Sequence, residues 1–346
     1  MGAVVKIAIT YNEKRSDDED EAEFDTREAI GAIARMVAGL GHSVVPVDVT
    51  GSIPRLATEL ARLAPDVVFN FAEGERGAFR EAFYPALFEQ LGLAHTGSSA
   101  STLAVCLDKR LAKRIVAAAR VRVPRGKLVR SAADPLGDLP GPLIVKPNLE
   151  GSSKGITAAS VVADPAQLAG TVAAALARYP GGVLVEELVP GRDVAVGWFA
   201  GIGLLPPVGY AYDGEIYDYA LKHTSPERVE VQVPAPLSPL VAARLTTAAE
   251  RAFSALGVTG YGRADFRITP EGEVVFLEMN PLPSLTLAVG HDELYVAAAA
   301  LGRSPRELLA AILDSAARLD QVEDTHGGSS CQLGGSRRHR SSMTQS

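Results

Sequence analysis

The sequence predicts a mixed α/β and α+β protein with several domains, and three stretches of the chain support this. In residues 4–91, short apolar runs alternate with helical patterns, an order that is typical of a parallel α/β sheet. From residue 142 onward, the pattern changes to strands separated by turn residues. Residues 261–286 then predict a β-hairpin. With 346 residues, the chain can bury a sizeable core in two or three domains.

The individual elements follow from hydrophobic periodicity and from turn and cap residues. Asp25 and Glu28 form a capping-box pattern for the first helix, which Gly41 terminates. The predicted strands are residues 4–10, 43–47, 66–71, 143–147, 183–187, 264–268 and 273–277. The predicted helices are residues 25–40, 54–63, 78–91, 239–256, 291–301 and 304–319, with a helical pair at residues 103–119. Residues 321–346 are rich in Gly, Ser, Arg and Gln, so we expect a disordered tail.

Composition and charge narrow the class of protein. Hydrophobic residues make up 47% of the chain and charged residues 22%, as in soluble globular proteins. A net charge of -7, without a Lys/Arg cluster before the last residues, argues against nucleic-acid binding. The chain has no apolar run of membrane-spanning length, no signal-peptide pattern, and only two cysteines. We therefore expect a cytoplasmic protein with no membrane and no nucleic-acid partner.

The hairpin at residues 261–286 is the first candidate functional segment. Its strands should place Asp265 beside Glu278, with Asn280 two residues further on the same face. Carboxylate and amide oxygens are ligands that Mg²⁺ prefers in proteins. Acids buried next to apolar strand residues are costly unless a cation or a hydrogen-bond donor compensates them. The hairpin therefore predicts a Mg²⁺ site, and the alternative is a solvated hairpin with ordinary polar tips.

A glycine- and serine-rich loop follows the strand at residues 143–147. The strand carries Lys146, and the loop at residues 148–155 includes Ser152 and Ser153. Backbone N–H groups of such a loop approach a polyphosphate closely, hydroxyls donate to it, and the lysine adds charge. The loop is not a Walker A motif. A phosphate-binding loop is one interpretation, and a plain hairpin turn is the other.

Two further segments offer groups for a nucleotide. After the strand at residues 183–187, Glu186 and Asp193 with the backbone between them predict a clamp for adenine and ribose, although two surface acids flanking a turn would look the same. Residues 206–233 are polar and Tyr-rich, contain Lys222 and His223, and are long enough for a flap. A lone histidine is also often purely structural.

These motifs occur in a specific order along the chain: Asp108-Lys109, IVKPNLEGSSKG, VEELVPGRD, the flap with Lys222, GRADF and LEMNPLPS. In this order they resemble the ATP-grasp superfamily, and most closely the D-alanine-D-alanine ligase family, over residues 4–318. The resemblance implies an ATP-grasp fold with an N-terminal α/β domain (1–95), linker helices with a central subdomain (96–188), and a C-terminal subdomain (189–320). ATP would be held between the central and C-terminal parts.

The resemblance also implies a chemistry, that of an ATP-dependent carboxylate–amine ligase. A substrate carboxylate would attack the γ-phosphate of ATP, and an amine would capture the acyl phosphate to form a peptide bond, with amino acids as substrates. The residues implied by matching motif are Lys109, Lys146, Lys222 and Ser153 at the phosphates; Glu186, the backbone of Glu187 and Val189, and Asp193 at the nucleoside; Asp265, Glu278 and Asn280 at two Mg²⁺ ions, with Mn²⁺ as an alternative; and Arg263, Ser152, His223 and Ser284 as catalytic residues.

The sequence departs from the family pattern where the substrates bind. Glu73-Gly74 replaces His-Gly, Lys222-His223 replaces Lys-Tyr, Val289-Gly290 replaces Ser-Leu, and Ser284 replaces Gly. Glu13 or Glu28 is the expected amine-binding group. These differences keep three alternatives open: a ligase that makes depsipeptides such as D-alanyl-D-lactate, a specialised-metabolite ligase, and a nucleotide-binding protein without ligase activity. The expected partners are small carboxylate and amine substrates, and a homodimer is the assembly considered.

Overall fold

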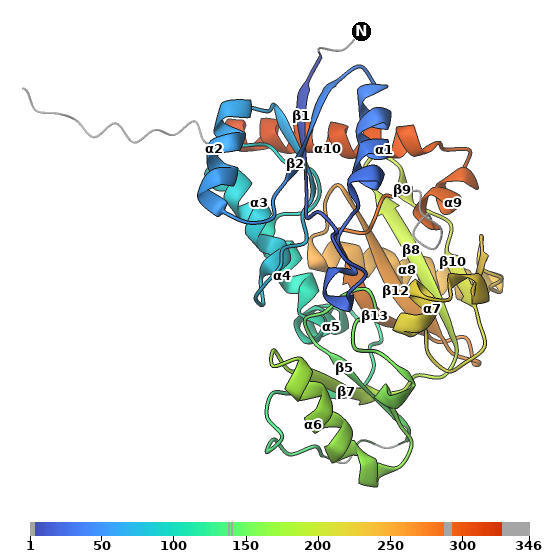
Figure 1. The fold of residues 1–346 in the computed structure, drawn as a ribbon. Helices are drawn as coiled ribbons and strands as arrows, with labels where there is room; N and C mark the ends of the chain where they lie inside the picture. Colours follow the sequence, from blue (N-terminus) through green and yellow to red (C-terminus); the bar gives the residue numbers. More distant parts are fainter. Residues whose placement is uncertain (1–3, 138, 140, 287–292, 327–346) are drawn as a thin grey trace, which may run out of the picture.

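The N-terminal part of the computed structural model is a three-layer α/β unit (Figure 1). The structure describes residues 4–137, 139, 141–286 and 293–326. Strands β1 (Lys6–Tyr11), β2 (Ser43–Asp48) and β3 (Val67–Phe71) form a parallel sheet in the order β2-β1-β3, which confirms the sequence prediction. Because strand side chains alternate, Ile7 and Ile9 pack with α1 (Arg27–Ala38) and α10 (Pro305–His326), whereas Ala8 packs with α2 (Ile53–Leu63) and α3 (Arg80–Gln90).

Two predictions about helix ends are wrong. The first helix is capped by Thr26, whose side chain accepts a hydrogen bond from the N–H of Ala29, and not by Asp25. At the other end of the chain, α10 continues to His326, six residues into the predicted disordered tail. Residues 327–346 lie outside the described residues, as do Val289 and Gly290.

The middle of the chain contains two linker helices and a small antiparallel sheet. Helices α4 (Ala100–Leu107) and α5 (Lys109–Ala118) come first. The sheet has the order β4-β7-β5-β6, with β4 (Gly126–Val129), β5 (Leu143–Pro147), β6 (Val161–Val162) and β7 (Val183–Glu187). Helix α6 (Leu168–Arg178) packs Leu168 and Val172 against this sheet. Figure 1 shows this lobe at the lower end of the molecule.

The last part of the chain is built on a larger antiparallel sheet. Its strands are β8 (Arg192–Phe199), β9 (Gly203–Leu204), β10 (Val208–Ala211), β11 (Glu230–Gln232), β12 (Tyr261–Ile268) and β13 (Val274–Asn280), in the order β11-β10-β8-β12-β13 with β9 beside β8. Helices α7 (Tyr219–His223), α8 (Pro239–Leu256) and α9 (Glu293–Ala299) belong to this part. Short 3₁₀ helices lie at η1 (Glu19–Glu21), η2 (Ala158–Ser160), η3 (Pro165–Gln167) and η4 (Pro226–Arg228). The predicted flap, residues 206–233, therefore contains β10, α7, η4 and β11.

The β12–β13 hairpin has the predicted register. Asp265 pairs with Glu278, and Arg263 pairs with Asn280. Immediately after Asp265 the register shifts, so that Phe266 pairs with Phe276 and Leu277 is the extra residue of a β-bulge. Bulges re-aim neighbouring side chains and are common next to active sites. This bulge lies directly beside the two predicted metal-binding acids.

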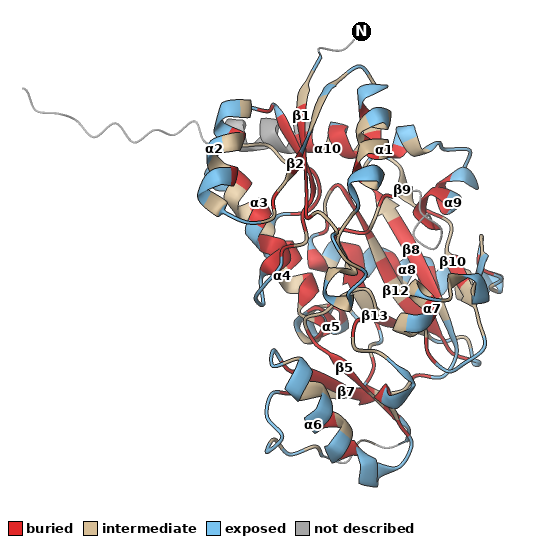
Figure 2. Cartoon of the chain, viewed as in Figure 1, coloured by how far each residue is buried: buried red, intermediate tan, exposed pale blue. Residues whose placement is uncertain are grey.

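Burial follows the layers of the fold. Buried residues line the sheets and the inner faces of the helices, while the outer faces of α2 and α6 are exposed (Figure 2). Helices α5 and α8 cover one face of the large sheet, where Val116 and Phe253 join the same core cluster as Phe266 and Phe276. Among the described residues, no helix combines the length and apolar character needed to cross a membrane.

Candidate active site

The β12–β13 hairpin holds two acids, each paired with a cation. Arg263 donates hydrogen bonds of 2.8 Å from Nε and from Nη2 to the two carboxylate oxygens of Asp265. Lys109 Nζ lies 2.9 Å from Glu278 Oε2. Arg263 also donates from Nη1 to Glu293 Oε1 at 2.9 Å. The sequence-predicted residues Arg263, Asp265, Lys109 and Glu278 therefore lie together, and Glu293 joins them.

Burial and ion pairing act against each other on these carboxyl groups. Burial raises the pKa of Asp265, and Arg263 offsets this only in part. Burial also acts to raise the pKa of Glu278, but Lys109, followed by Lys146, brings it down to about 2. Glu278 is therefore ionised at neutral pH.

The donor set at the hairpin fits a hard divalent cation. Asp265 and Glu278 supply carboxylate oxygens, and their side chains remain 21% and 29% exposed, so they are accessible from the adjacent cavities. Asn280 Oδ1 accepts a hydrogen bond from the N–H of Leu282 at 2.9 Å, which leaves it one further lone pair. Oxygen ligands of these types suit Mg²⁺, which usually takes one or two carboxylates together with water and phosphate.

Two cavities meet at this hairpin. The larger has a volume of about 220 Å³ and the smaller about 120 Å³. Both are lined by the same five charged residues, which are Lys109, Lys222, Arg263, Glu278 and Glu293. Charged groups at such a junction can act on two molecules, one bound in each cavity.

The smaller cavity contains several of the residues predicted to bind a nucleotide. Lys146, Ser153 and Asp193 line it. Asp193 accepts a hydrogen bond from Tyr212 Oη and lies 3.6 Å from Arg267 Nε. Burial raises the pKa of Asp193 in spite of Arg267. Asp193 is thus an acceptor held at the cavity, as a ribose ligand must be.

The end of β7 carries the backbone groups that the sequence assigned to a nucleoside. The N–H of Glu187 donates to Arg125 O at 2.8 Å, and the N–H of Leu188 donates to Pro142 O at 2.9 Å. Arg125 also donates a hydrogen bond of 2.8 Å from its Nε to the Glu187 carboxylate. Among the described residues, the N–H of Val189 makes no backbone hydrogen bond of this kind, and its assignment to a nucleoside stays a prediction. The Glu187 side chain is therefore held within the protein by Arg125.

The glycine- and serine-rich loop sits between the two cavities. Ser152 lines the larger cavity and Ser153 the smaller one. Both have left-handed backbones, with φ of 49° and 57° respectively, a conformation that costs energy in a residue with a side chain. Ser153 Oγ donates to Tyr217 O at 3.3 Å, and His223 Nε2 lies 3.0 Å from Ser152 O. The loop is therefore tied to the flap on both sides.

The remaining predicted catalytic residues also face the larger cavity. Lys222 and Ser284 both line it. Burial lowers the pKa of Lys222, and Arg263 adds to this effect. Ser284 Oγ shares a hydrogen bond of 3.1 Å with Thr286 Oγ1. Burial likewise lowers the pKa of His223, with Lys222 contributing, and the centroid of its ring lies 4.4 Å from that of the Tyr219 ring, with the two planes tilted by 31°.

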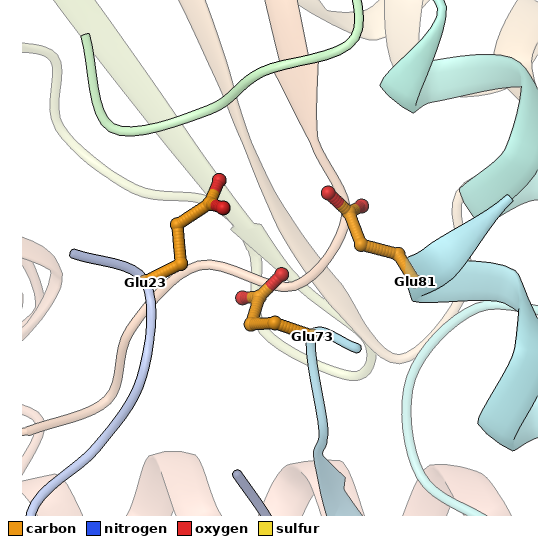
Figure 3. A group of neighbouring side chains, drawn as sticks. All are labelled: Glu23, Glu73 and Glu81. Carbon is orange, nitrogen blue, oxygen red and sulfur yellow. The ribbon is translucent and has the colours of Figure 1, made fainter. Parts of the chain in front are cut away.

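One wall of the larger cavity is acidic. It consists of Glu23, Asp25, Glu73 and Glu81, which we call the acidic wall. Figure 3 shows Glu23, Glu73 and Glu81 converging from three separate segments, and their nearest oxygens all lie within 4.8 Å of one another. Glu23 is the most closely paired of these four among the described residues, with Arg80 at 2.8 Å and Lys154 at 2.6 Å, and Glu81 lies 3.6 Å from Arg80.

The pKa values in the acidic wall separate these carboxyls into two kinds. Burial acts to raise the pKa of Glu23, but Arg80 and Lys154 bring it down to about 2. Burial raises the pKa of Asp25 to about 7 and that of Glu81 to about 7, although Arg80 opposes the shift at Glu81. Burial raises the pKa of Glu73 well above its usual value, and Glu81 adds to the effect. In three of the four groups burial therefore favours the protonated form, and a cationic ligand beside them would favour the ionised form.

The sequence-based candidates for the amine-binding group, Glu13 and Glu28, lie away from the larger cavity. Glu13 is held by Arg27 through hydrogen bonds of 2.9 and 3.0 Å, and Glu28 is exposed on α1. Neither lines the larger cavity. Sequence reasoning missed Glu23 and Glu81, whose only local signal was their place in an acidic segment and at the start of a helix. It also missed Glu293, which no motif marked.

Comparison with known proteins agrees with this arrangement. Residues 128–314 match the family model described as the D-ala D-ala ligase C-terminus. A D-alanine--D-alanine ligase from Anaeromyxobacter sp. (strain Fw109-5) is 35% identical over 317 residues, which cover 90% of this chain and 97% of the relative.

Solved structures share the fold. The D-alanine--D-alanine ligase from Bacillus anthracis, crystallised with ATP, superimposes with a TM-score of 0.72 at 21% identity, covering 92% of this chain and 100% of that structure. The VanG D-Ala:D-Ser ligase from Enterococcus faecalis gives a TM-score of 0.69 at 21% identity, covering 91% of this chain and 100% of that structure. The fold is therefore the ATP-grasp fold, and the chain belongs to the D-alanine--D-alanine ligase family.

Proposed function

We propose that this protein is an ATP-dependent carboxylate–amine ligase that forms an amide bond through an acyl phosphate. The observation that carries the proposal is the junction of the two cavities, where Arg263 and Lys109 surround the Asp265–Glu278 pair. A nucleotide in the smaller cavity and a carboxylate in the larger one would meet there. A protein that only bound a nucleotide would have no need for a second cavity with a cationic group at its mouth.

In the first step, a carboxylate oxygen of one substrate attacks the γ-phosphorus, and ADP leaves with the electron pair of the broken P–O bond. We assign Lys109, Lys146 and Lys222 to the phosphates, because positioning and charge supply most of the catalysis in phosphoryl transfer. Ser153 and its loop would cover the phosphates. Mg²⁺ held by Asp265, Glu278 and Asn280 would supply further positive charge there.

In the second step, an amine nitrogen attacks the carbonyl carbon of the acyl phosphate. The tetrahedral intermediate then expels inorganic phosphate and leaves the amide. Arg263 is held rigidly by Asp265 and Glu293, so its guanidinium is preorganised for the developing oxyanion, and the N–H of Ser284 is assigned as the second donor. Ser152 would position the substrates from the loop, and His223 would act from the flap.

The substrates are proposed to carry ammonium groups, as amino acids do. The acidic wall of the larger cavity supports this, because a cationic amino group would favour the ionised form of these carboxyls and would then pair with it. A hydroxy acid as the second substrate, which would give a depsipeptide, is the second candidate. The presence of His223 in the flap favours testing it. The cytoplasmic location and the homodimer stay predictions.

The test is ADP release measured with a panel of D- and L-amino acids, hydroxy acids and dipeptides, with Mg²⁺ and with Mn²⁺. We expect release that depends on two substrates together, one of them an amino acid. Binding of ATP without substrate-dependent release across the whole panel would favour a nucleotide-binding protein without ligase activity. Release with hydroxy acids in preference to amino acids would establish the second candidate.

A further inference from the structure

Lys113 is a buried charge to which the proposed reaction assigns no part. It lies one turn after Lys109 on α5, so the two side chains share a face of the helix. Only 1% of the Lys113 residue surface is exposed. Its Nζ contacts both carboxylate oxygens of Glu186 on β7, which is 2% exposed. Lys146 Nζ lies 3.0 Å from one of the same oxygens.

Two buried ammonium groups therefore share one carboxylate. Burying charges is costly unless each is compensated, and here one carboxylate serves both lysines, with Glu278 acting on Lys146 as well. Burial lowers the pKa of Lys113 to about 7, even though Glu186 opposes the shift. The cluster lies beside the smaller cavity, which Lys146 lines. An anion in that cavity would offer Lys146 a partner other than Glu186.

The stem of Glu186 is held in place from the other side. Gly126 pairs with Glu186 across β4 and β7. A Cβ atom at Gly126 would lie 2.6 Å from Glu186 Cγ, so the glycine backbone packs directly against this side chain. Glu186 is therefore fixed between Gly126 and Lys113. Lys146 is the member of the group that reaches the cavity.

We propose that Lys113 is a positioning residue that neutralises Glu186 and so frees Lys146 to bind nucleotide phosphate. This rests on the proposed function, in which Lys146 contacts ATP. When the nucleotide binds, Lys146 exchanges the Glu186 carboxylate for a phosphate, and Lys113 keeps Glu186 paired. Without Lys113, the departure of Lys146 would leave Glu186 buried and unpaired, and Lys146 would stay on the carboxylate.

The test compares nucleotide affinities of the full-length protein by calorimetry with ATP, ADP and adenosine. Lys113→Met keeps the length of the side chain and removes its charge. We expect it to weaken ATP and ADP binding by about tenfold or more, as for the loss of a buried charge partner, and to leave adenosine binding unchanged. Lys113→Arg should restore binding. Arg114→Met, an exposed neighbour on the same helix, is the matched control.

A second comparison, between Glu186→Gln and the double variant Glu186→Gln/Lys113→Met, separates this role from simple packing. It does not need the single Lys113→Met variant to fold. In the background of Glu186→Gln there is no carboxylate to neutralise, so adding Lys113→Met should not change ATP affinity further. A further loss in the double variant, or equal weakening of ATP and adenosine in Lys113→Met, would overturn the proposal. Absence of ATP binding in the unmodified protein would overturn the proposed function, and this inference with it.

Discussion

The two sides of the active site differ in how their charges are balanced. On the nucleotide side, Asp265, Glu278 and Glu186 each contact at least one lysine or arginine. On the opposite side, the acidic wall has one strongly paired member, Glu23, and three carboxyls with raised pKa values. In the proposed function, the first side receives an anion and the second receives a cation. The difference indicates that the charges on the proposed nucleotide side are paired within the protein. On the proposed substrate side, the positive charge that would stabilise the ionised carboxyls has to come from the ligand.

The largest expected effect is at the hairpin. Asp265→Asn and Glu278→Gln should each reduce turnover by about a hundredfold or more. Each removes a carboxylate that is proposed to hold the Mg²⁺ ion beside the phosphates. The fold should persist, since both side chains are partly exposed. Steady-state ADP release, with circular dichroism as the folding control, measures this. Normal turnover in both variants would remove the acids from the metal site and abolish the contrast between the two sides.

The hairpin was predictable because its determinants are local. Strand alternation, a turn of Pro270-Glu271-Gly272 and a fixed register place Asp265 opposite Glu278 without reference to the rest of the chain. The parallel N-terminal sheet follows from alternation of strands and helices for the same reason. Lys109, Lys146 and Lys222 could be located from the order of the motifs, although their contacts could not.

The acidic wall was not predictable because its determinants are long-range. Glu23 comes from a loop before α1, Glu73 follows β3, and Glu81 begins α3, and only tertiary packing brings them together. The Lys113–Glu186 pair joins residues that are 73 positions apart. Helical periodicity places Lys113 on a face but does not reveal that this face is buried against a carboxylate.

The next effect concerns the contribution of the acidic wall to the stability of the protein. The folded protein holds a proton on Glu81 up to pH about 7, whereas an unfolded glutamate releases it near pH 4.3. The folded state therefore binds more protons between these values, so the free energy of unfolding falls as pH rises through this range. Glu81→Gln mimics the protonated form permanently. Its stability relative to the unmodified protein should increase from pH 5 to pH 8 by on the order of 2 kcal/mol.

Urea unfolding at the two pH values measures this difference. Glu75→Gln, at an exposed position six residues earlier in the same segment, is the control and should show no pH-dependent gain. If the stability difference between Glu81→Gln and the unmodified protein is the same at pH 5 and pH 8, then the pKa of Glu81 is not raised in the folded protein.

A smaller effect is expected on substrate binding by the same wall. Glu73→Gln should raise the KM for the ammonium-bearing substrate by about tenfold while kcat changes less, because the lost attraction acts on the bound substrate and on the transition state alike. The KM for ATP should stay unchanged, since Glu73 does not line the smaller cavity. Equal increases in both KM values would show that the two sides are not electrostatically separate.

The smallest effect is expected at His223, where the two sides touch through the flap. The lowered pKa of His223 comes from burial and from Lys222, so the ring is neutral in the folded protein at pH values where a free histidine still carries charge. The folded state thus binds fewer protons than the unfolded state, and the stability contributed by neutral His223 is present above pH about 6.5 and is lost as pH falls below it. Any effect of a cationic His223 on the choice between amine and hydroxyl nucleophiles is confined to this acidic range.

The measurement is the ratio of amide to ester product with competing nucleophiles, from pH 5.5 to pH 9, in the unmodified protein and in His223→Phe. We expect the two profiles to coincide above pH about 7 and to separate below it, with hydroxy acids gaining in the unmodified protein because a charged ring repels a protonated amine. Phenylalanine can keep the tilted ring contact with Tyr219 but loses the contact with Ser152 O. Identical profiles over the whole range would remove His223 from nucleophile selection and leave it as a structural link between the flap and the serine loop.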